Sequence, residues 1–139
     1  MYKRQIYDHT APDKVDHPQS RRRTVYRFIV RSVPNPFLDC LDGADPNINT
    51  PVRSSTITAL QALALRNDLF MVKQAERFAR RLEAASHDPR RQVEAAYVLA
   101  LGRPPRPEER DALASHAARH GLANACRLLF NTNEFVFID

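Results

Sequence analysis

Apolar residues recur at steps of three and four through the second half of the chain, which is the spacing of one buried helix face. The clearest case lies between Leu69 and Ala85, where basic side chains occupy the opposite face. This pattern predicts an amphipathic helix over that range, with Val72, Ala75, Phe78, Ala79 and Leu82 facing inward.

A shorter helix is predicted just before it, beginning after Thr58. Thr58 is followed three residues later by Gln61, which is a capping-box pattern. Leu60, Leu63 and Ala64 are expected to form its buried stripe. Asn67 and Asp68 then end this helix and cap the next one, since both side chains suit N-cap geometry.

Three more helices follow, each bounded by start and stop signals. The first begins at Asp88-Pro89 and ends at Gly102, the second begins at Pro107 and ends at Gly121, and the third runs from Leu122 to about Asn131. The expected inward residues are Val93, Ala96, Tyr97, Ala100, Leu101, Leu113, His116, Ala117, His120, Leu122, Cys126 and Leu129. The apolar tail 133–139 is expected to dock on them. The prediction is an all-α fold of about five short helices in a small bundle.

The first part of the chain is less regular. Residues 1–23 are polar, basic and interrupted by prolines, so we expect an irregular leader before a helical domain at 24–139. The segment Thr24–Val33 fits either a strand or a short helix. A helix is favoured because no second strand is evident, and Pro34 ends the segment in either case.

The 139 residues suffice for one domain, and the net charge of +5 suits an anionic partner or simple solubility. Arg21–Arg23 and the basic row Arg77–Arg81 could bind an anionic polymer, although solvated basic faces explain both without a nucleic-acid ligand. No run of apolar residues is long enough for a membrane span. The start of the chain lacks the apolar segment of a secretion signal, which indicates a cytoplasmic chain as written.

No motif for a cofactor or a catalytic nucleophile is evident. Three glycines cannot supply a phosphate-binding loop, a dinucleotide fingerprint or a nucleophile elbow. Cys40 and Cys126 have no metal-ligand spacing, so two free thiols are favoured over one disulfide. His116 and His120 have the i, i+4 spacing of zinc ligands, but no third ligand is evident. We therefore expect no cofactor and no metal, and the chain gives no sign of being an enzyme.

A loop between residues 39 and 46 places three carboxylates at steps of three, at Asp39, Asp42 and Asp45. The calcium-loop pattern is absent, so turn formation is the simpler interpretation. Polar residues that could line a binding site gather here and around the first predicted helix cap. The candidate binding residues are Asp42, Asp45, Arg53, Gln61, Asn67 and Asp68.

Five blocks, in order, resemble one known family. They are Arg21–Phe28 with the following Pro34 and Pro36, Leu41–Pro46, Thr58–Asp68, Leu101–Glu109 and Asn131–Phe135. Together they resemble the C-terminal domain of unknown function of large planctomycete exported proteins, which often carry cytochrome-c-like or carbohydrate-binding-like modules upstream. The resemblance covers the chain from about Val15. Ala59 stands where the family has proline, and Arg66 where it has leucine.

The resemblance implies an exported, periplasmic or cell-surface setting, and a domain that extends upstream of this chain, so that the chain is a fragment. We therefore expect a non-catalytic helical interaction module whose partner is another protein or the upstream part of the family domain. One alternative is part of an enzyme acting in carbohydrate breakdown or redox chemistry, with Arg53, Gln61, Asn67 and Asp68 facing Asp42 and Asp45. Weak binding of an anionic polymer is another.

Overall fold

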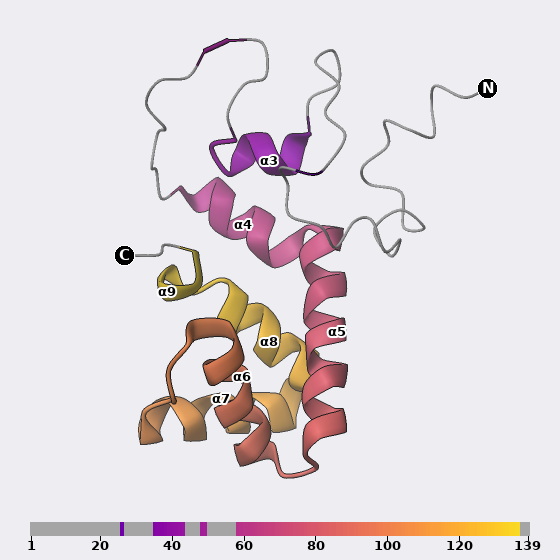
Figure 1. Cartoon of the computed structure of the whole chain (residues 1–139), viewed down its shortest axis with the longest axis vertical. Helices are drawn as coiled ribbons and strands as arrows, with labels where there is room; N and C mark the ends of the chain where they lie inside the picture. Colours follow the sequence, from indigo (N-terminus) through magenta and orange to yellow (C-terminus); the bar gives the residue numbers. More distant parts are fainter. Residues whose placement is uncertain (1–25, 27–34, 44–47, 50–57, 137–139) are drawn as a thin grey trace, which may run out of the picture. The chain divides into compact units, whose positions relative to one another are not determined.

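The chain is all-α in the part that the structure, a computed structural model, describes. The described residues are 26, 35–43, 48–49 and 58–136, and they hold seven helices and no strand. The helices are α3 (Pro36–Cys40), α4 (Ala59–Asn67), α5 (Leu69–Ala85), α6 (Pro89–Leu101), α7 (Pro107–His120), α8 (Leu122–Phe130) and α9 (Asn133–Val136) (Figure 1). The predicted fold class is confirmed. None of these helices is long and apolar enough to cross a membrane.

The chain divides into two compact units. The N-terminal unit runs to Ala64 and includes Asp68–Phe70, and the C-terminal unit holds Leu65–Asn67 and the chain from Met71 onward. The boundary predicted between residues 23 and 24 lies outside the described residues. So does most of the segment Thr24–Val33, of which only the exposed Tyr26 is described.

In the N-terminal unit α3 is a single turn with a defined start and end. The Asn35 side chain accepts a hydrogen bond from the Phe37 N–H at 3.1 Å, and Pro36 fixes the first helical position. At the other end Asp42 adopts φ 55°, and the Gly43 N–H donates to the Leu38 carbonyl at 2.8 Å. This bond and the left-handed residue before it form a Schellman-type end, with aspartate where glycine is usual.

The start of α4 confirms the predicted capping box, but its buried face is not the one predicted. The Thr58 N–H donates to Gln61 Oε1 at 3.1 Å, and the Gln61 N–H donates to Thr58 Oγ1 at 3.2 Å. The buried residues are Gln61 and Leu65, whereas Leu60 and Leu63 are 65% and 56% exposed. The buried stripe predicted for Leu60 and Leu63 was therefore wrong. The helix is turned so that the Gln61 amide meets the Asp42 carboxylate at 2.9 Å.

The core of the C-terminal unit begins on α5, whose bounds match the prediction. Asp68 caps the helix, because its Oδ1 accepts from the Phe70 N–H at 2.8 Å. The buried residues of α5 are Met71, Ala75, Ala79 and Leu82, which lie on one face. Phe78 on the same helix stacks on Phe130 of α8, with ring centroids 5.4 Å apart.

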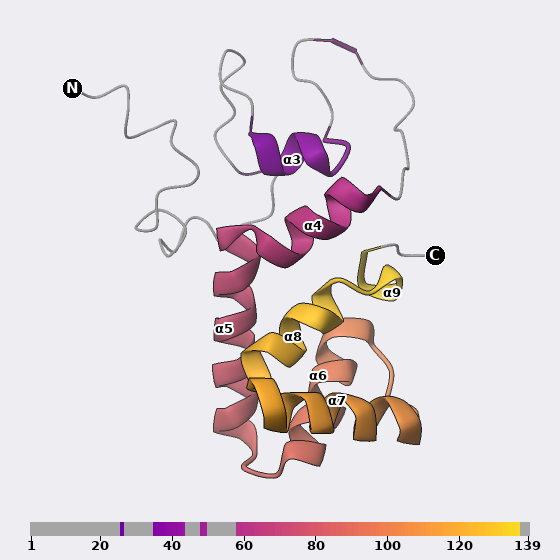
Figure 2. The same ribbon diagram turned by 180° about the vertical axis from the view of Figure 1, so that it is seen from behind.

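Helices α6, α7 and α8 pack on one another beside α5 (Figure 2). Asp88 caps α6 with Pro89 at its first position, and Gly102 ends it at φ 73°. The core residues of these helices are Val93, Ala96, Tyr97, Ala125, Cys126, Leu129 and Phe130. Of the residues predicted to face inward, Val93, Ala96 and Tyr97 on α6 and Cys126 and Leu129 on α8 are buried, which confirms the central part of each predicted face. None of the residues predicted inward on α7 is fully buried, and His120 is exposed.

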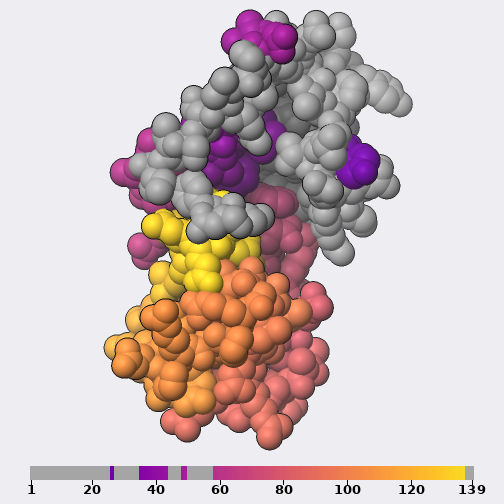
Figure 3. Space-filling model, turned by 60° about the vertical axis from the view of Figure 1, so that its left-hand side comes forward, coloured from indigo at the N-terminus to yellow at the C-terminus, as the bar shows by residue number. Residues whose placement is uncertain are grey.

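The tail beyond α8 docks as expected through Val136, where the described residues end. Its residues Asn133–Val136 form α9, a helix that the sequence did not predict, and α9 contacts α6 and α8. The Phe135 ring lies 4.8 Å from that of Phe130, centroid to centroid. In the space-filling view the yellow C-terminal segment lies against the orange α6–α7 region (Figure 3).

Candidate functional site

Two of the six candidate binding residues, Asp42 and Gln61, meet in the N-terminal unit. Gln61 is 8% exposed, and its Nε2 donates to Asp42 Oδ2 at 2.9 Å. Its Oε1 already accepts from the Thr58 N–H, so both ends of the amide are engaged. The pair joins the end of α3 to the start of α4. This geometry suits a structural tie, because a buried amide bonded at both ends has little capacity left for a ligand.

The remaining candidates do not extend that pair within the described residues. Asn67 is the exposed last residue of α4, six positions beyond Gln61, and Asp68 caps α5. Arg53 and Asp45 lie outside the described residues. An enzyme site would require Asp42, Arg53 and Asn67 to converge, and that convergence stays a prediction.

Of the three carboxylates of the acidic loop, Asp39 and Asp42 are described, and Asp45 lies outside the described residues. Asp39 lies exposed in the only turn of α3, and Asp42 is half-buried against Gln61. Asp42 forms the turn that ends α3, and the turn-forming interpretation of the whole loop stays a prediction.

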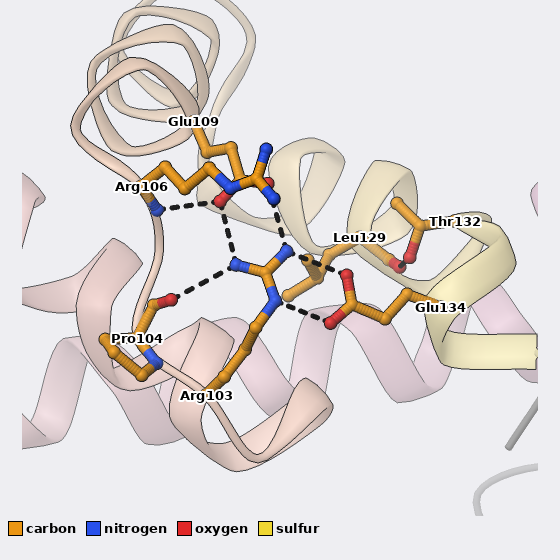
Figure 4. Close-up of polar contacts among 7 residues, drawn as sticks. All are labelled: Arg103, Pro104, Arg106, Glu109, Leu129, Thr132 and Glu134. Carbon is orange, nitrogen blue, oxygen red and sulfur yellow. Dashed lines mark hydrogen bonds and ion pairs between the residues drawn. The ribbon is translucent and has the colours of Figure 1, made fainter. Parts of the chain in front are cut away.

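Arg103 of the C-terminal unit makes five side-chain hydrogen bonds within the described residues, and no sequence motif singled it out. Its guanidinium forms two bonds to Glu109, at 2.9 and 3.0 Å, and two to Glu134, at 2.6 and 2.7 Å. A fifth bond reaches the Pro104 carbonyl at 3.1 Å, and the Tyr97 ring lies 5.4 Å from the guanidinium carbon. Figure 4 shows the guanidinium between the two carboxylates.

Hydrogen bonds shift the pKa values of the three charged groups in this Arg103 network, and burial shifts that of Tyr97. Hydrogen bonds from Arg103 lower the pKa of Glu109 to about 2 and also lower the pKa of Glu134. Hydrogen bonds to Glu134 and Glu109 raise the pKa of Arg103. Burial, and then the Glu109 charge, raise the pKa of Tyr97. None of these groups is poised to exchange a proton near neutral pH, so the network fits a structural tie better than acid–base catalysis.

One signal in the sequence could have found this network. Arg103 directly follows the predicted helix end at Gly102, and Glu109 lies in the first turn of the next helix. A basic residue before a short Pro-rich connector and an acidic residue after it are placed to meet. Glu134 lies 31 positions away in sequence, and only the folded chain brings it to Arg103.

The two cysteines are free thiols, as the sequence favoured. Cys126 is buried in α8, and burial raises its pKa to about 12. A thiol with that pKa is protonated at neutral pH and is a poor nucleophile. Cys40 is half-buried in α3.

The basic side chains of α5 differ in their exposure and in their contacts. Lys73 pairs with Glu76 at 3.0 Å, and the Arg77 Nη1 atom is buried. Arg80 and Arg81 are exposed. Arg77 is therefore less exposed than these two arginines, and Arg21–Arg23 lie outside the described residues. Binding of an anionic polymer stays a prediction.

Two imidazoles of α7 form a separate cluster. The rings of His116 and His120 have centroids 4.6 Å apart. Partial burial lowers the pKa of His116, and the nearby His120 and Arg119 add to the effect.

In the described residues the chain is all-α, and its Gln61–Asp42 pair and Arg103 network fit structural ties. Residues 2–117 match the family model described as PSD1, protein of unknown function (DUF1553). The chain belongs to this family. No curated protein matches the chain, and neither does any solved structure.

Proposed function

We propose that this chain is a non-catalytic interaction module that binds another polypeptide through the outer face of α4. One observation carries the proposal. Leu60 and Leu63, one turn apart on α4, are 65% and 56% exposed, although leucine is usually buried. Ala59 and Ala62 beside them are exposed as well, so this face is apolar over two turns.

The anchoring of α4 leaves this face free to bind. Gln61 and Leu65 point inward, and the Gln61 amide holds the helix through Asp42 and Thr58. These contacts fix the rotation of α4 about its axis. A helix held in this way presents its leucines without first paying an ordering cost, which favours binding.

The charge of the helix defines the chemistry of the partner. Arg66 is the only charged residue of α4, it is exposed, and the chain carries a net charge of +5. The partner that fits is an amphipathic helix with leucine-type residues at i, i+3 and i+4 and carboxylates beside the stripe. Its apolar side would cover Leu60 and Leu63, and its carboxylates would favour encounter with a basic chain.

The family resemblance supports a setting for this role. Large exported planctomycete proteins with cytochrome-c-like or carbohydrate-binding-like modules would place the partner helix in the cell envelope, in the same polypeptide or in another. In that setting the module would serve assembly, and any redox or carbohydrate chemistry would belong to the other modules.

The test uses a synthetic fluorescent peptide of about 18 residues, with leucines at helical spacing and glutamates on the other positions. We expect the chain to bind this peptide in a fluorescence-anisotropy titration. The double variant Leu60→Ser, Leu63→Ser should weaken binding about tenfold or more, because it removes the apolar contact. The free energy of unfolding of this variant should lie within about 0.5 kcal/mol of that of the parent chain, since both side chains are exposed.

A matched pair of exposed apolar residues on α6 provides the control. Val98 and Leu99 are 52% and 49% exposed, so Val98→Ser, Leu99→Ser removes comparable surface elsewhere and should leave binding unchanged. A peptide of the same composition with its leucines scattered should not bind. Equal binding of both peptides, or equal loss in both double variants, would contradict the proposal. A dimer that Leu60→Ser, Leu63→Ser dissociates would show that the occupant is a second copy instead.

A further inference from the structure

The His116–His120 pair is a cluster to which neither the fold nor the proposed interaction gives a role. Both residues lie in the last turns of α7, at i and i+4, and so share one side of the helix. His116 is half-buried and His120 is exposed, so the pair is open to solvent. The rings lie close together, with centroids 4.6 Å apart and planes tilted by 41°.

The ring spacing matches a particular coordination geometry. A metal–nitrogen distance of about 2.0 Å puts the ion about 3.2 Å from the centre of each bound imidazole. Two rings bound at about 90° to each other then have centres about 4.5 Å apart, and at a tetrahedral angle about 5.2 Å. The observed separation of 4.6 Å lies nearer to the value for 90°, which is the cis angle of tetragonal Cu²⁺ and Ni²⁺ sites.

The polar neighbours leave the rings available. Arg119 donates to the Ser115 carbonyl at 3.4 Å, and Asn124 donates to the His120 carbonyl at 2.7 Å, so both side chains engage backbone oxygens.

We propose that His116 and His120 form a two-imidazole chelate for divalent copper on the surface of α7, with water in the remaining coordination positions. The described residues contain no group of three ligands that could close a structural zinc site. A site with two nitrogen ligands and open positions should follow the general order of affinities, in which Cu²⁺ binds more tightly than Ni²⁺ and Zn²⁺. The site is therefore exchangeable rather than structural.

The test is the thermal unfolding of the whole chain with added CuSO₄, followed by circular dichroism. A ligand that binds only the folded state raises the Tm, and Cu²⁺ at about a hundred times its Kd should raise it by about 5–10 °C. Ni²⁺, which does not oxidise thiols, should raise the Tm by less, and Zn²⁺ by less again. A larger rise with Zn²⁺ than with Cu²⁺ would overturn the assigned geometry.

A shifted pair gives the matched control. The double variant His120→Ala, Ala118→His keeps two histidines on α7 but sets them at i, i+2, where they do not face each other. Ala118 is exposed, so the helix should fold normally. This variant and the single variants His116→Ala and His120→Ala should lose most of the Tm rise, whereas His87→Ala should keep it. A full Tm rise in the shifted pair, or none in the parent chain, would overturn the proposal.

Discussion

Two glycines of this chain are needed for different physical reasons. A Cβ added to Gly43 would lie 2.6 Å from the Leu38 carbonyl oxygen, so Gly43 is needed for space. Gly102 has nothing within 4 Å of an added Cβ, but its φ of 73° lies in the left-handed region. Gly102 is therefore needed for its conformational freedom.

Asparagine substitutions should separate these two requirements. Gly102→Ala should cost about 1–2 kcal/mol of unfolding free energy, and Gly102→Asn clearly less, because asparagine tolerates the left-handed region. Gly43→Ala and Gly43→Asn should both cost about 1–3 kcal/mol, because any Cβ meets the carbonyl. Urea unfolding of the four variants checks this. A rescue by asparagine at Gly43 equal to that at Gly102 would contradict the assignment.

At the scale of the element, local signals predicted the helix boundaries well. The bounds of α5 and α6, and the starts of α4 and α7, coincide with the predicted ones. Three of these starts are set by Thr58, Asp68 and Asp88, whose side chains accept bonds from neighbouring backbone N–H groups. The short helices α3 and α9 were not predicted, because four or five residues carry too little periodicity.

The Arg103 network, which joins the α6–α7 connector to α9, should make the stability of the C-terminal unit depend on acid. The folded pKa of Glu109 is about 2, below its usual value, so its contribution is present above about pH 4.5 and is lost as the pH falls toward 2. In the variant Glu109→Gln the free energy of unfolding should therefore decrease less as the pH falls over that range. Urea unfolding at a series of pH values measures this dependence.

The neighbouring Glu108 gives the control for this prediction. It lies in the same first turn of α7, near the same helix dipole, and is exposed. Glu108→Gln should leave the acid dependence close to that of the parent chain. The same flattening in both variants would attribute the effect to the helix end and not to Arg103.

At the scale of the whole molecule, each compact unit carries one thiol. Cys40 lies half-buried in the N-terminal unit, and Cys126 lies buried in the C-terminal unit. Their reactivities therefore report separately on the opening of the two units.

Thiol labelling of the native chain should modify Cys40 well before Cys126. Burial and a pKa of about 12 keep Cys126 protonated and covered. Its labelling by a chromogenic disulfide reagent in increasing urea should follow the loss of helical circular dichroism. Cys40→Ser isolates the Cys126 signal, and fast labelling of that variant without urea would show that the C-terminal unit is open in its native state.

The sequence by itself determined the all-α class, most helix boundaries and the inward faces of α5, α6 and α8, because caps and periodicity are local properties. Tertiary structure decided which face of α4 is buried, since the Gln61 amide is fixed by Asp42, 19 positions away. It also decided the Arg103–Glu134 pairing across 31 positions. Such contacts depend on where distant segments meet, and no local pattern of residues contains that information.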